Sequence, residues 1–338
     1  PFFFHADAAI LDAQESRGLG DVYKRQLKEK NEALCLDLSD LTEVVPGFGF
    51  GKGIGSGSAF SMRGIGSYGI GAAVVSSLVT NMNGHSVGTG QFVDLGFMDI
   101  ERVEVLKGPQ GTLNGRNSVQ GVINLITKRP TSELEGYLDV EGGNYGRSLM
   151  KGAVNIPLTD NINSRIAFMS NQRDGMVHNA NTGNDYDDRN DVGLRFSLDW
   201  NLSDTTDLKF TYSGQKSDDN RPLEEVSFCQ QDQFFGCSPW ERGTPNTAAD
   251  SRGIGAGLFS FIAALYPGTI TSDYGATPPA LELGELSVNR EPTHLQKIEF
   301  SNLELVKELS DSLTMTAKYS YETRMFQQMN DNDGSVSY

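Results

Sequence analysis

Strict alternation of apolar and polar residues marks the second part of the chain. In the segment 189–203, apolar side chains occupy every second position, and charged, amide or small residues occupy the positions between them. The apolar set is Val192, Leu194, Phe196, Leu198, Trp200 and Leu202. Because successive side chains of a strand point to opposite faces, this segment predicts a strand with one face in an apolar medium and the other in a polar one.

The same alternation recurs along the chain after residue 130. Together with the first segment it gives seven candidate strands, the other six being 136–142, 148–158, 161–175, 205–217, 295–309 and 312–326. Short turns such as 157–161 and 201–206 join some of them. Long polar loops join others, one at 175–188 and a very large one at 218–292. The pattern therefore predicts long antiparallel strands with unequal connections at their two ends.

A soluble β-sandwich would also show alternation, so a second observation is needed. The inward-facing set carries charge, in Arg165, Arg195, Asp199, Lys209, Lys318 and Glu322. Aromatic residues stand near strand ends, as interfacial girdles do, in Trp200, Tyr212, Tyr319, Tyr321 and Phe326. An apolar outer band, a charged inner face and short turns alternating with long loops are typical of an outer-membrane barrel. The pattern favours the barrel and leaves the sandwich as the alternative.

Residues 27–130 follow a different pattern, glycine-rich and mixed, with short apolar runs. The run 100–106 predicts a short helical turn leading into a strand, and 122–127 predicts a buried strand. We therefore expect a small α+β domain here. Residues 1–26 share neither pattern, and their end, ESRGLGDVYKRQ, resembles a translated sequencing-adaptor tail. We set them aside as a tail of non-native appearance.

Composition narrows the function classes. With 28 basic and 44 acidic residues the net charge is −16, which argues against a protein that binds nucleic acid through phosphate contacts. The longest apolar runs, such as 72–79, are far shorter than the ~20 residues that a membrane-spanning helix needs. The 38 glycines suit strands and turns.

The few cysteines and histidines indicate no metal site. Cys229 and Cys237 enclose a short polar segment, which predicts a disulfide in an oxidising compartment; two unrelated thiols are the alternative, and Cys35 is a third thiol. The four histidines are too scattered to form a metal site, and nothing ties a nucleophile to a histidine and an acid. We expect no metal, no cofactor and no enzymatic activity.

Two further patterns have ordinary explanations. The segment 64–69 matches the G-x-G-x-x-G spacing of a dinucleotide site, but the chain lacks the successive βα units that such a fold requires. The acidic segments 184–191 and 330–334 have the oxygen ligands that a hard cation prefers. Solvated loops are the favoured interpretation of both segments, with a cation site as the alternative.

The segment 99–130, DIERVEVLKGPQGTLNGRNSVQGVINLITKRP, closely resembles the end of the plug domain of TonB-dependent outer-membrane receptors. The matching residues are Glu101, Arg102, Glu104, Lys107, Gly108, Pro109, Gly111, Gly115, Arg116, Ser118, Gly121, Asn124, Thr127, Lys128 and Pro130. Upstream, the segment 60–66 with Arg63 and Gly64 resembles an early plug strand. The chain departs from the family pattern at Asn114, where a tyrosine is usual, and at Gln120, where the first of two glycines is usual.

The resemblance implies an all-β membrane barrel, antiparallel and partial, preceded by a small α+β plug domain. Residues 27–130 would be the plug and 131–338 the N-terminal part of the barrel, with about seven strands of an expected ~22. The location implied is the outer membrane of a Gram-negative bacterium. The implied partners are outer-membrane lipid, the TonB energy-coupling protein in the periplasm, and a scarce ligand such as a ferric siderophore. Alternatives are cobalamin, haem or a glycan as ligand, or a non-transporting adhesin or passive pore.

Site residues follow from the same resemblance. Candidate ligand contacts are His85, Gln91, Phe92 and Asn114 on plug loops, and Phe234, Phe235 and Trp240 in the large loop. Charges confined in a barrel lumen are costly without partners, so we expect the charged motif residues to pair with one another or with barrel charges; they are Glu101, Arg102, Glu104, Lys107 and Arg116. The glycines at 108, 111, 115 and 121 are expected in tight turns with positive φ.

Overall fold

The computed structural model describes residues 22–26, 41–52, 58–67, 77–87, 97–111, 118–221, 228–229, 231–232, 236–237, 244–245, 285–286 and 291–329. Strands predominate in these ranges, and the α-helix α2 (Leu41–Val44) has four residues. Within the described ranges no helix has the length and apolar character to cross a membrane.

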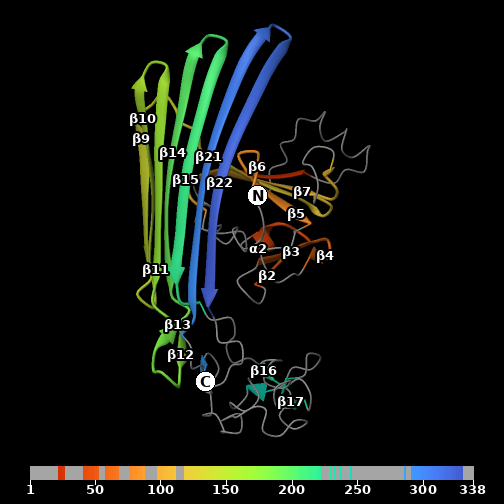
Figure 1. Cartoon of the computed structure of the whole chain (residues 1–338), viewed down its shortest axis with the longest axis vertical. Coiled ribbons are helices and arrows are strands. Elements are labelled where there is room, and N and C mark those ends of the chain that lie inside the picture. The colour runs from red at the N-terminus through yellow and green to blue at the C-terminus, as the bar shows by residue number, and fades with distance from the viewer. Residues whose placement is uncertain are drawn as a thin grey trace.

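Seven long strands form one antiparallel sheet, which Figure 1 shows as a tall curved wall. Each strand pairs with its neighbours in chain order, so the sheet is a meander with β9 and β22 at its edges. The seven segments predicted from alternation form these strands: β9 (Glu135–Gly142), β10 (Ser148–Thr159), β11 (Ile162–Arg173), β14 (Arg189–Ser203), β15 (Thr206–Asp219), β21 (Thr293–Ser310) and β22 (Leu313–Met329). The prediction of long antiparallel strands is confirmed.

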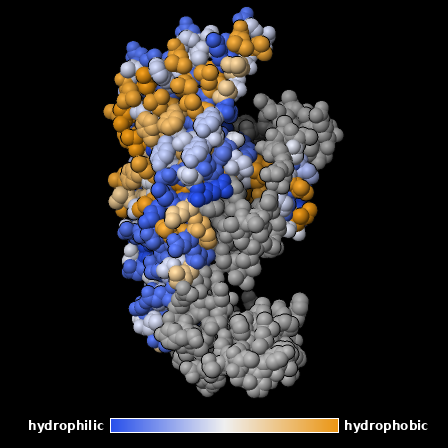
Figure 2. All heavy atoms as spheres, in the orientation of Figure 1, coloured by the Kyte–Doolittle hydropathy of each residue, from blue (hydrophilic) through white to orange (hydrophobic). Residues whose placement is uncertain are grey.

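The two faces of the long sheet differ as the alternation predicted. In β14, Val192 and Leu194 are exposed, whereas Asp191, Arg195 and Ser197 are buried on the opposite face. Exposed large apolar residues continue the outer face on other strands, among them Leu138, Val140, Met150, Val154, Leu303, Met315, Tyr319, Tyr321 and Met325. Figure 2 shows apolar residues gathered toward the end of the sheet that carries the short turns.

Loop lengths also differ between the two ends of the sheet. Turns at 159–162, 203–206 and 310–313 join strand pairs at the upper end in Figure 1. Toward the other end lie short strands within the predicted long loops: β12 (Val177–Asn179), β13 (Asp185–Tyr186), β16 (Phe228–Cys229), β17 (Gln231–Asp232), β18 (Gly236–Cys237), β19 (Thr244–Pro245) and β20 (Glu285–Leu286). In membrane barrels the short turns are periplasmic and the long loops extracellular.

The N-terminal domain is built on a mixed five-stranded sheet with the order β1-β7-β8-β5-β6. Its strands are β1 (Val22–Gln26), β5 (Leu78–Met82), β6 (His85–Ser86), β7 (Ile100–Lys107) and β8 (Gly121–Thr127). Strands β5 and β8 are parallel, and the other pairs are antiparallel. A three-stranded sheet of β2 (Phe48–Lys52), β3 (Ser58–Met62) and β4 (Ile65–Ser67) accompanies it.

One apolar core joins these two sheets and α2. It contains Leu41, Val45, Phe48, Phe60, Met62, Leu78, Phe97, Ile100, Val103, Val105, Ile123 and Leu125. Val103 and Val105 are buried with the half-buried Glu104 between them, a period of two, and the whole of 100–107 is the strand β7. The prediction of a helical turn in 100–106 was wrong, because pairing with β8 and β1 on both sides holds this segment extended.

Strand β1 lies within the residues set aside as a tail. Val22 to Gln26 pair in antiparallel register with Leu106 to Arg102 of β7 and form the edge of the five-stranded sheet. The non-native appearance of residues 1–26 stays a prediction.

Two motif glycines have the positive φ that was expected of them. Gly108 has φ +91 and Gly121 has φ +153, and a Cβ on Gly121 would stand 2.3 Å from the carbonyl oxygen of Leu106. A larger residue at 121 would therefore break the pairing of β7 and β8 where it begins. The expectation was wrong for Gly111, whose φ is not positive, and Gly115 lies outside the described residues.

Candidate functional site between the N-terminal domain and the long sheet

A buried ion pair holds the N-terminal domain against the long sheet. Asp99 stands just before β7, and Arg165 projects from the inner face of β11. Two hydrogen bonds of 2.7 Å run from Nε and Nη2 of Arg165 to the two carboxylate oxygens, and both side chains are at least 95% buried. The hydroxyl of Tyr137 on β9 donates a third bond to Asp99, at 3.3 Å. Side chains of the long sheet thus hydrogen-bond to both oxygens of the Asp99 carboxylate.

Met98 extends this contact into the sheet. Its carbonyl oxygen accepts a hydrogen bond of 2.5 Å from Nη1 of Arg195, which is itself almost fully buried. Its side chain packs in an apolar cluster with residues of β10 and β11, namely Leu149, Ala153, Ala167 and Met169. Asp99 has φ +49, the turn that presents Met98 and Asp99 to the sheet together. We call Met98, Asp99, Tyr137, Arg165 and Arg195 the clamp.

The connection between the two parts is fixed on the same side. Asn155 of β10 is fully buried; it accepts a bond of 2.8 Å from the amide of Thr131 and donates to the carbonyls of Thr131 and Glu133 at 2.7 and 2.5 Å. Arg129 pairs with Asp199 of β14 and donates to the hydroxyl of Thr211. Burial lowers the pKa of Arg129, and the charge of Glu304 opposes that shift.

His85 meets the last described strand of the sheet. Its Nε2 lies 2.8 Å from Oε2 of Glu322 on β22, and its ring lies 5.0 Å from the ring of Phe300 on β21. Arg324 also contacts the Glu322 carboxylate. The structure therefore places this predicted ligand residue at the interface between the two parts, and its contact with a ligand stays a prediction.

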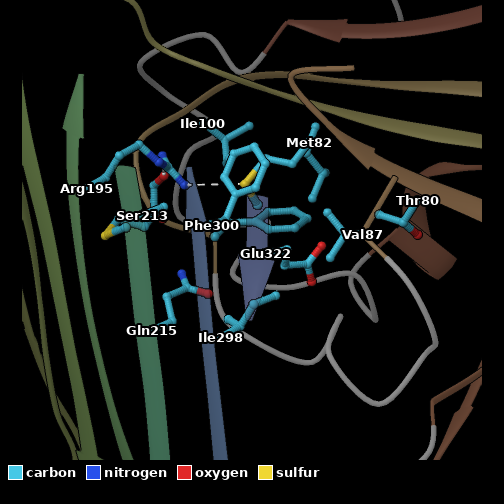
Figure 3. Close-up of a pocket in the computed structure, with 13 residues that line it drawn as sticks. Thr80, Met82, Val87, Ile100, Arg195, Ser213, Gln215, Ile298, Phe300 and Glu322 are labelled. Atoms are coloured by element: carbon cyan, nitrogen blue, oxygen red, sulfur yellow. Dashed lines mark hydrogen bonds between the residues drawn. The ribbon is translucent and has the colours of Figure 1, made fainter. Parts of the chain in front are cut away.

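A small, mainly apolar cavity of about 40 Å³ lies between the clamp and His85. Figure 3 shows Met82, Val87, Ile298 and Phe300 around it, with the Arg195 guanidinium reaching in from β14 to contact the sulfur of Met82 at 3.9 Å. Ile298 and Val87 also form a small apolar cluster of their own.

The charged motif residues pair among themselves. Nη1 of Arg102 lies 2.6 Å from Glu101, and its Nε lies 2.8 Å from Glu104. Burial acts to lower the pKa of Arg102, but the hydrogen bonds and charges of Glu104 and Glu101 outweigh it, so that pKa is raised. Lys107 is buried and donates to the carbonyl of Pro46 at 2.7 Å, which ties β7 to the segment before β2. The expected pairing within the motif is confirmed for Glu101, Arg102 and Glu104.

A second buried network lies on the inner face near the long-loop end of the sheet, and sequence reasoning missed it. The Ser217 hydroxyl donates to Asp191 at 2.6 Å, and Nε of Arg221 donates to Asp219 at 2.9 Å. Nδ1 of His294 stands 3.1 Å from Oδ1 of Asp219, within ion-pair distance but without hydrogen-bond geometry. Only the register of β15 against β21, which sets Asp219 opposite His294, brings these groups together.

The described part of the chain holds no group of three or more His, Cys, Asp or Glu side chains able to bind a metal ion. In the acidic loop 184–191, Asp187 pairs with Arg173 and Arg189, each at 2.8 Å. The other predicted site residues lie outside the described residues: Gln91, Phe92, Asn114, Gly115, Arg116, Phe234, Phe235 and Trp240. So do the side chains of Cys229 and Cys237, whose disulfide stays a prediction.

Comparison with known families identifies the N-terminal domain. Residues 17–122 match the model of the TonB-dependent Receptor Plug Domain. The N-terminal domain is a TonB-dependent receptor plug. Among curated relatives, a pesticin receptor of Yersinia pestis is 36% identical over 90 residues, which are 26% of this chain and 13% of that protein. The ferric enterobactin receptor PirA of Pseudomonas aeruginosa is 27% identical over 234 residues, 62% of this chain and 30% of that protein.

Solved structures show the same fold beyond the plug. The ferric yersiniabactin uptake receptor FyuA of Yersinia pestis aligns with a TM-score of 0.67 at 16% identity, covering 93% of this chain and 42% of that one. The siderophore receptor PiuA of Acinetobacter baumannii aligns with a TM-score of 0.63 at 18% identity, covering 92% and 37%. The chain thus spans less than half of each of these receptors. Its long sheet is part of an outer-membrane β-barrel of a Gram-negative bacterium, and the plug packs on the inner face of that sheet.

Proposed function

We propose that this chain is part of a TonB-dependent outer-membrane receptor that takes up a scarce ligand, an iron–siderophore complex. The observation that carries the proposal is the clamp, which fixes a plug domain on the inner face of a barrel sheet. A plug held by buried polar contacts closes a pore that must open on demand. Several relatives are named for iron chelates, including the ferric enterobactin receptor and a ferripyoverdine receptor that is 42% identical over 65 residues.

In this proposal the chain performs transport, and no chemical reaction is required of it. The ligand binds on the extracellular side, between the long loops and the plug, and shifts the plug toward a second state for which the ligand has higher affinity. The periplasmic TonB protein then pulls on the plug and opens a passage. His85, Gln91, Phe92, Asn114, Phe234, Phe235 and Trp240 remain the candidate ligand contacts.

The proposed domain boundaries place the plug at 27–130 and the barrel at 131–338. In the described structure, β9 and β22 each have one unpaired edge. Unpaired backbone groups are very costly within a bilayer, where no water can satisfy them. We therefore propose that further strands close the barrel, as an edge-free barrel requires.

An adhesin or a passive pore is the second candidate from the sequence. A passive pore needs no domain on its inner face, so the plug and its clamp favour gated transport. Cobalamin, haem or a glycan would use the same fold, and the names of the relatives favour iron chelates over these ligands.

Uptake of radioactive iron tests the proposal. The full-length receptor, with its complete barrel, would be expressed in iron-starved cells that lack their own siderophore receptors. Uptake would be measured with and without a functional TonB. We expect uptake of iron as a siderophore complex that disappears without TonB. Uptake that persists in the absence of TonB would contradict the proposal, and uptake of none of a panel of iron chelates would contradict the assignment of the ligand.

A further inference from the structure

Arg195 is a buried cation with few hydrogen-bond partners. It projects from β14 into the interface between the plug and the barrel sheet and is 2% exposed. Of the five N–H donors of a guanidinium, one on Nη1 donates to the carbonyl oxygen of Met98 at 2.5 Å, and Nη2 contacts the sulfur of Met82, a weak acceptor, at 3.9 Å. Nε is buried and has no hydrogen-bond partner in the described part of the structure. A buried charge with so few bonds is costly, so a further partner is expected at Nε.

The carboxylates near Arg195 are engaged by other cations. Asp99 accepts hydrogen bonds from Arg165 on both of its oxygens, each at 2.7 Å. Glu322 is the carboxylate that lines the small cavity beside the clamp, and it contacts Arg324 and the histidine of β6. Among the described residues, no ion pair includes Arg195. The guanidinium of Arg195 therefore has no carboxylate of its own.

The charges of this part of the interface do not cancel. Three guanidinium groups stand against two carboxylates, namely Arg165, Arg195 and Arg324 against Asp99 and Glu322. The histidine of β6 adds positive charge when it is protonated. Glu135 of β9 also acts on Arg165, but Glu135 is exposed and water screens its charge. About one positive charge is therefore left uncompensated between the plug and the sheet.

The guanidinium of Arg195 reaches into the cavity between the clamp and His85, as Figure 3 shows. The volume of about 40 Å³ is enough for one small ion, or for about three water molecules at roughly 10–15 Å³ each. Thr80, Ser213 and Gln215 contribute hydroxyl and amide groups to a lining that is otherwise mainly apolar. The small volume and the apolar walls favour a monovalent ion over a strongly hydrated, multivalent one.

We propose that this cavity is a binding site for a small monovalent anion, a halide such as chloride, and that the bound ion completes the docking of the plug on the barrel sheet. The anion lies against Nε of Arg195, the donor without a partner. Desolvating an anion is costly, but Arg195 is already desolvated, so the anion neutralises a charge that the fold has buried. The inference goes beyond the proposed function, because the ion is part of the interface and not the transported ligand.

Anomalous diffraction tests whether the cavity binds a halide. Crystals of the full-length receptor would be soaked in sodium bromide, because bromide resembles chloride in charge and hydration and scatters anomalously. We expect an anomalous peak within about 3.5 Å of the Arg195 guanidinium, slightly beyond the range of N–H···O bonds because a halide is larger than an oxygen atom. A cavity that holds water molecules only, with no anomalous peak, would overturn the proposal.

The choice of salt tests the role of the ion in docking. Unfolding of the plug in denaturant, followed by proteolysis, would be compared in sodium chloride and in sodium gluconate at one ionic strength, since gluconate is too large for the cavity. For a site with a Kd of about 50 mM, roughly 200 mM chloride should lower the unfolding equilibrium constant about fivefold, because only the docked plug binds the ion. Equal constants in the two salts would overturn the proposal and would mark any bromide peak as an adventitious ion only.

Substitution of Arg195 tests the assignment to this site. Arg195→Met removes the guanidinium and keeps an unbranched side chain, so its unfolding constant should be the same in chloride and in gluconate. Arg173→Met is the matched control and should keep the chloride effect, because Arg173 lies on the inner face of β11, outside the cavity, and pairs with its own carboxylate, Asp187. A chloride effect that persists in Arg195→Met would overturn the assignment.

A second variant keeps the test decisive where Arg195→Met does not fold. Arg195→Lys retains the positive charge but replaces the planar guanidinium by a single ammonium group. Its chloride Kd, taken from the dependence of plug unfolding on chloride concentration, should therefore be higher than that of the wild type. An unchanged Kd in Arg195→Lys would overturn the proposal that the guanidinium holds the ion.

Discussion

Asp99 of the plug and Arg165 of the barrel sheet, 66 positions apart in the sequence, form a bidentate buried ion pair with two hydrogen bonds of 2.7 Å. Neither residue could be replaced alone without leaving its partner buried and uncompensated. The pair fixes both the position of the plug and the conformation of the turn that presents Met98 to the apolar cluster of β10 and β11.

Loss of this carboxylate should therefore be costly. We expect Asp99→Ala to destabilise the docked plug by about 3–5 kcal/mol, the scale of breaking one partner out of a buried pair. Denaturant unfolding in detergent micelles, followed by proteolysis of the plug, would measure it. Asp204→Ala, at an exposed turn of the barrel sheet, is the control and should change little. A similar midpoint for the two variants would show that the clamp does not hold the plug.

The contact between His85 and Glu322 should show energetic coupling. In a double-mutant cycle with His85→Gln and Glu322→Gln, we expect an interaction energy of about 0.5–1 kcal/mol, since the pair is only partly buried. The readout is the same unfolding midpoint of the plug. Strict additivity of the two substitutions would mean that the 2.8 Å contact contributes nothing to docking.

Gln120 is a weak point of the plug. It is 2% exposed, and neither atom of its amide has a partner in the described structure. We expect Gln120→Met, which keeps the shape and removes the buried polar group, to stabilise the plug by about 1–3 kcal/mol. Gln110→Met is the matched control, because Gln110 is equally buried and does have a partner. Stabilisation by both substitutions, or by neither, would contradict this account.

Asn155 should keep the connection between plug and barrel structurally ordered. Asn155→Ala removes its bonds to Thr131 and Glu133, and we expect a loss of about 2 kcal/mol together with faster proteolytic cleavage between 128 and 134. Asn163→Ala on the next strand is the comparison. Cleavage rates that match in the two variants would argue against this role.

The loop before β14 should be pH-sensitive. Burial raises the pKa of Asp188, an effect that neighbouring Asp219 reinforces, while a hydrogen bond from the amide of Asn220 opposes it. A raised carboxyl pKa means that the folded loop binds its proton more tightly than the unfolded chain does. Loop stability should therefore decrease as the pH rises from the ordinary aspartate value through the raised one.

Hydrogen exchange at the Asn220 amide measures this dependence. Asp188→Asn keeps an acceptor for that amide and removes the charge, so the pH dependence should disappear while protection at neutral pH persists or increases. A wild-type loop that gains protection with rising pH in this range would contradict the expected sign.

Local patterns in the sequence carried much of the fold. Alternation along 189–203 and along the six similar segments predicted all seven long strands and their apolar faces, because the side-chain period of a strand is a property of the backbone itself. The positive φ of Gly108 and Gly121 was also predicted from the sequence, because a residue without a Cβ adopts such a conformation at no steric cost. The run 100–106 was harder, since a short apolar run has no reliable period, and only its pairing with β1 and β8 decides that it is extended.

The sites were decided by the tertiary structure. Arg165 and Arg195 were visible in the sequence as inward charges, but nothing local shows that one binds the carboxylate of Asp99 and the other the carbonyl of Met98. The meeting of Asp219 with His294 depends on strand register, and the cavity beside Arg195 depends on where the plug docks against β14, β15 and β21. The alternation of apolar and polar residues is a local property of the sequence. Contacts between distant residues arise only from the way whole sheets pair and pack, which is why the sequence determined the strands and the tertiary structure decided the sites.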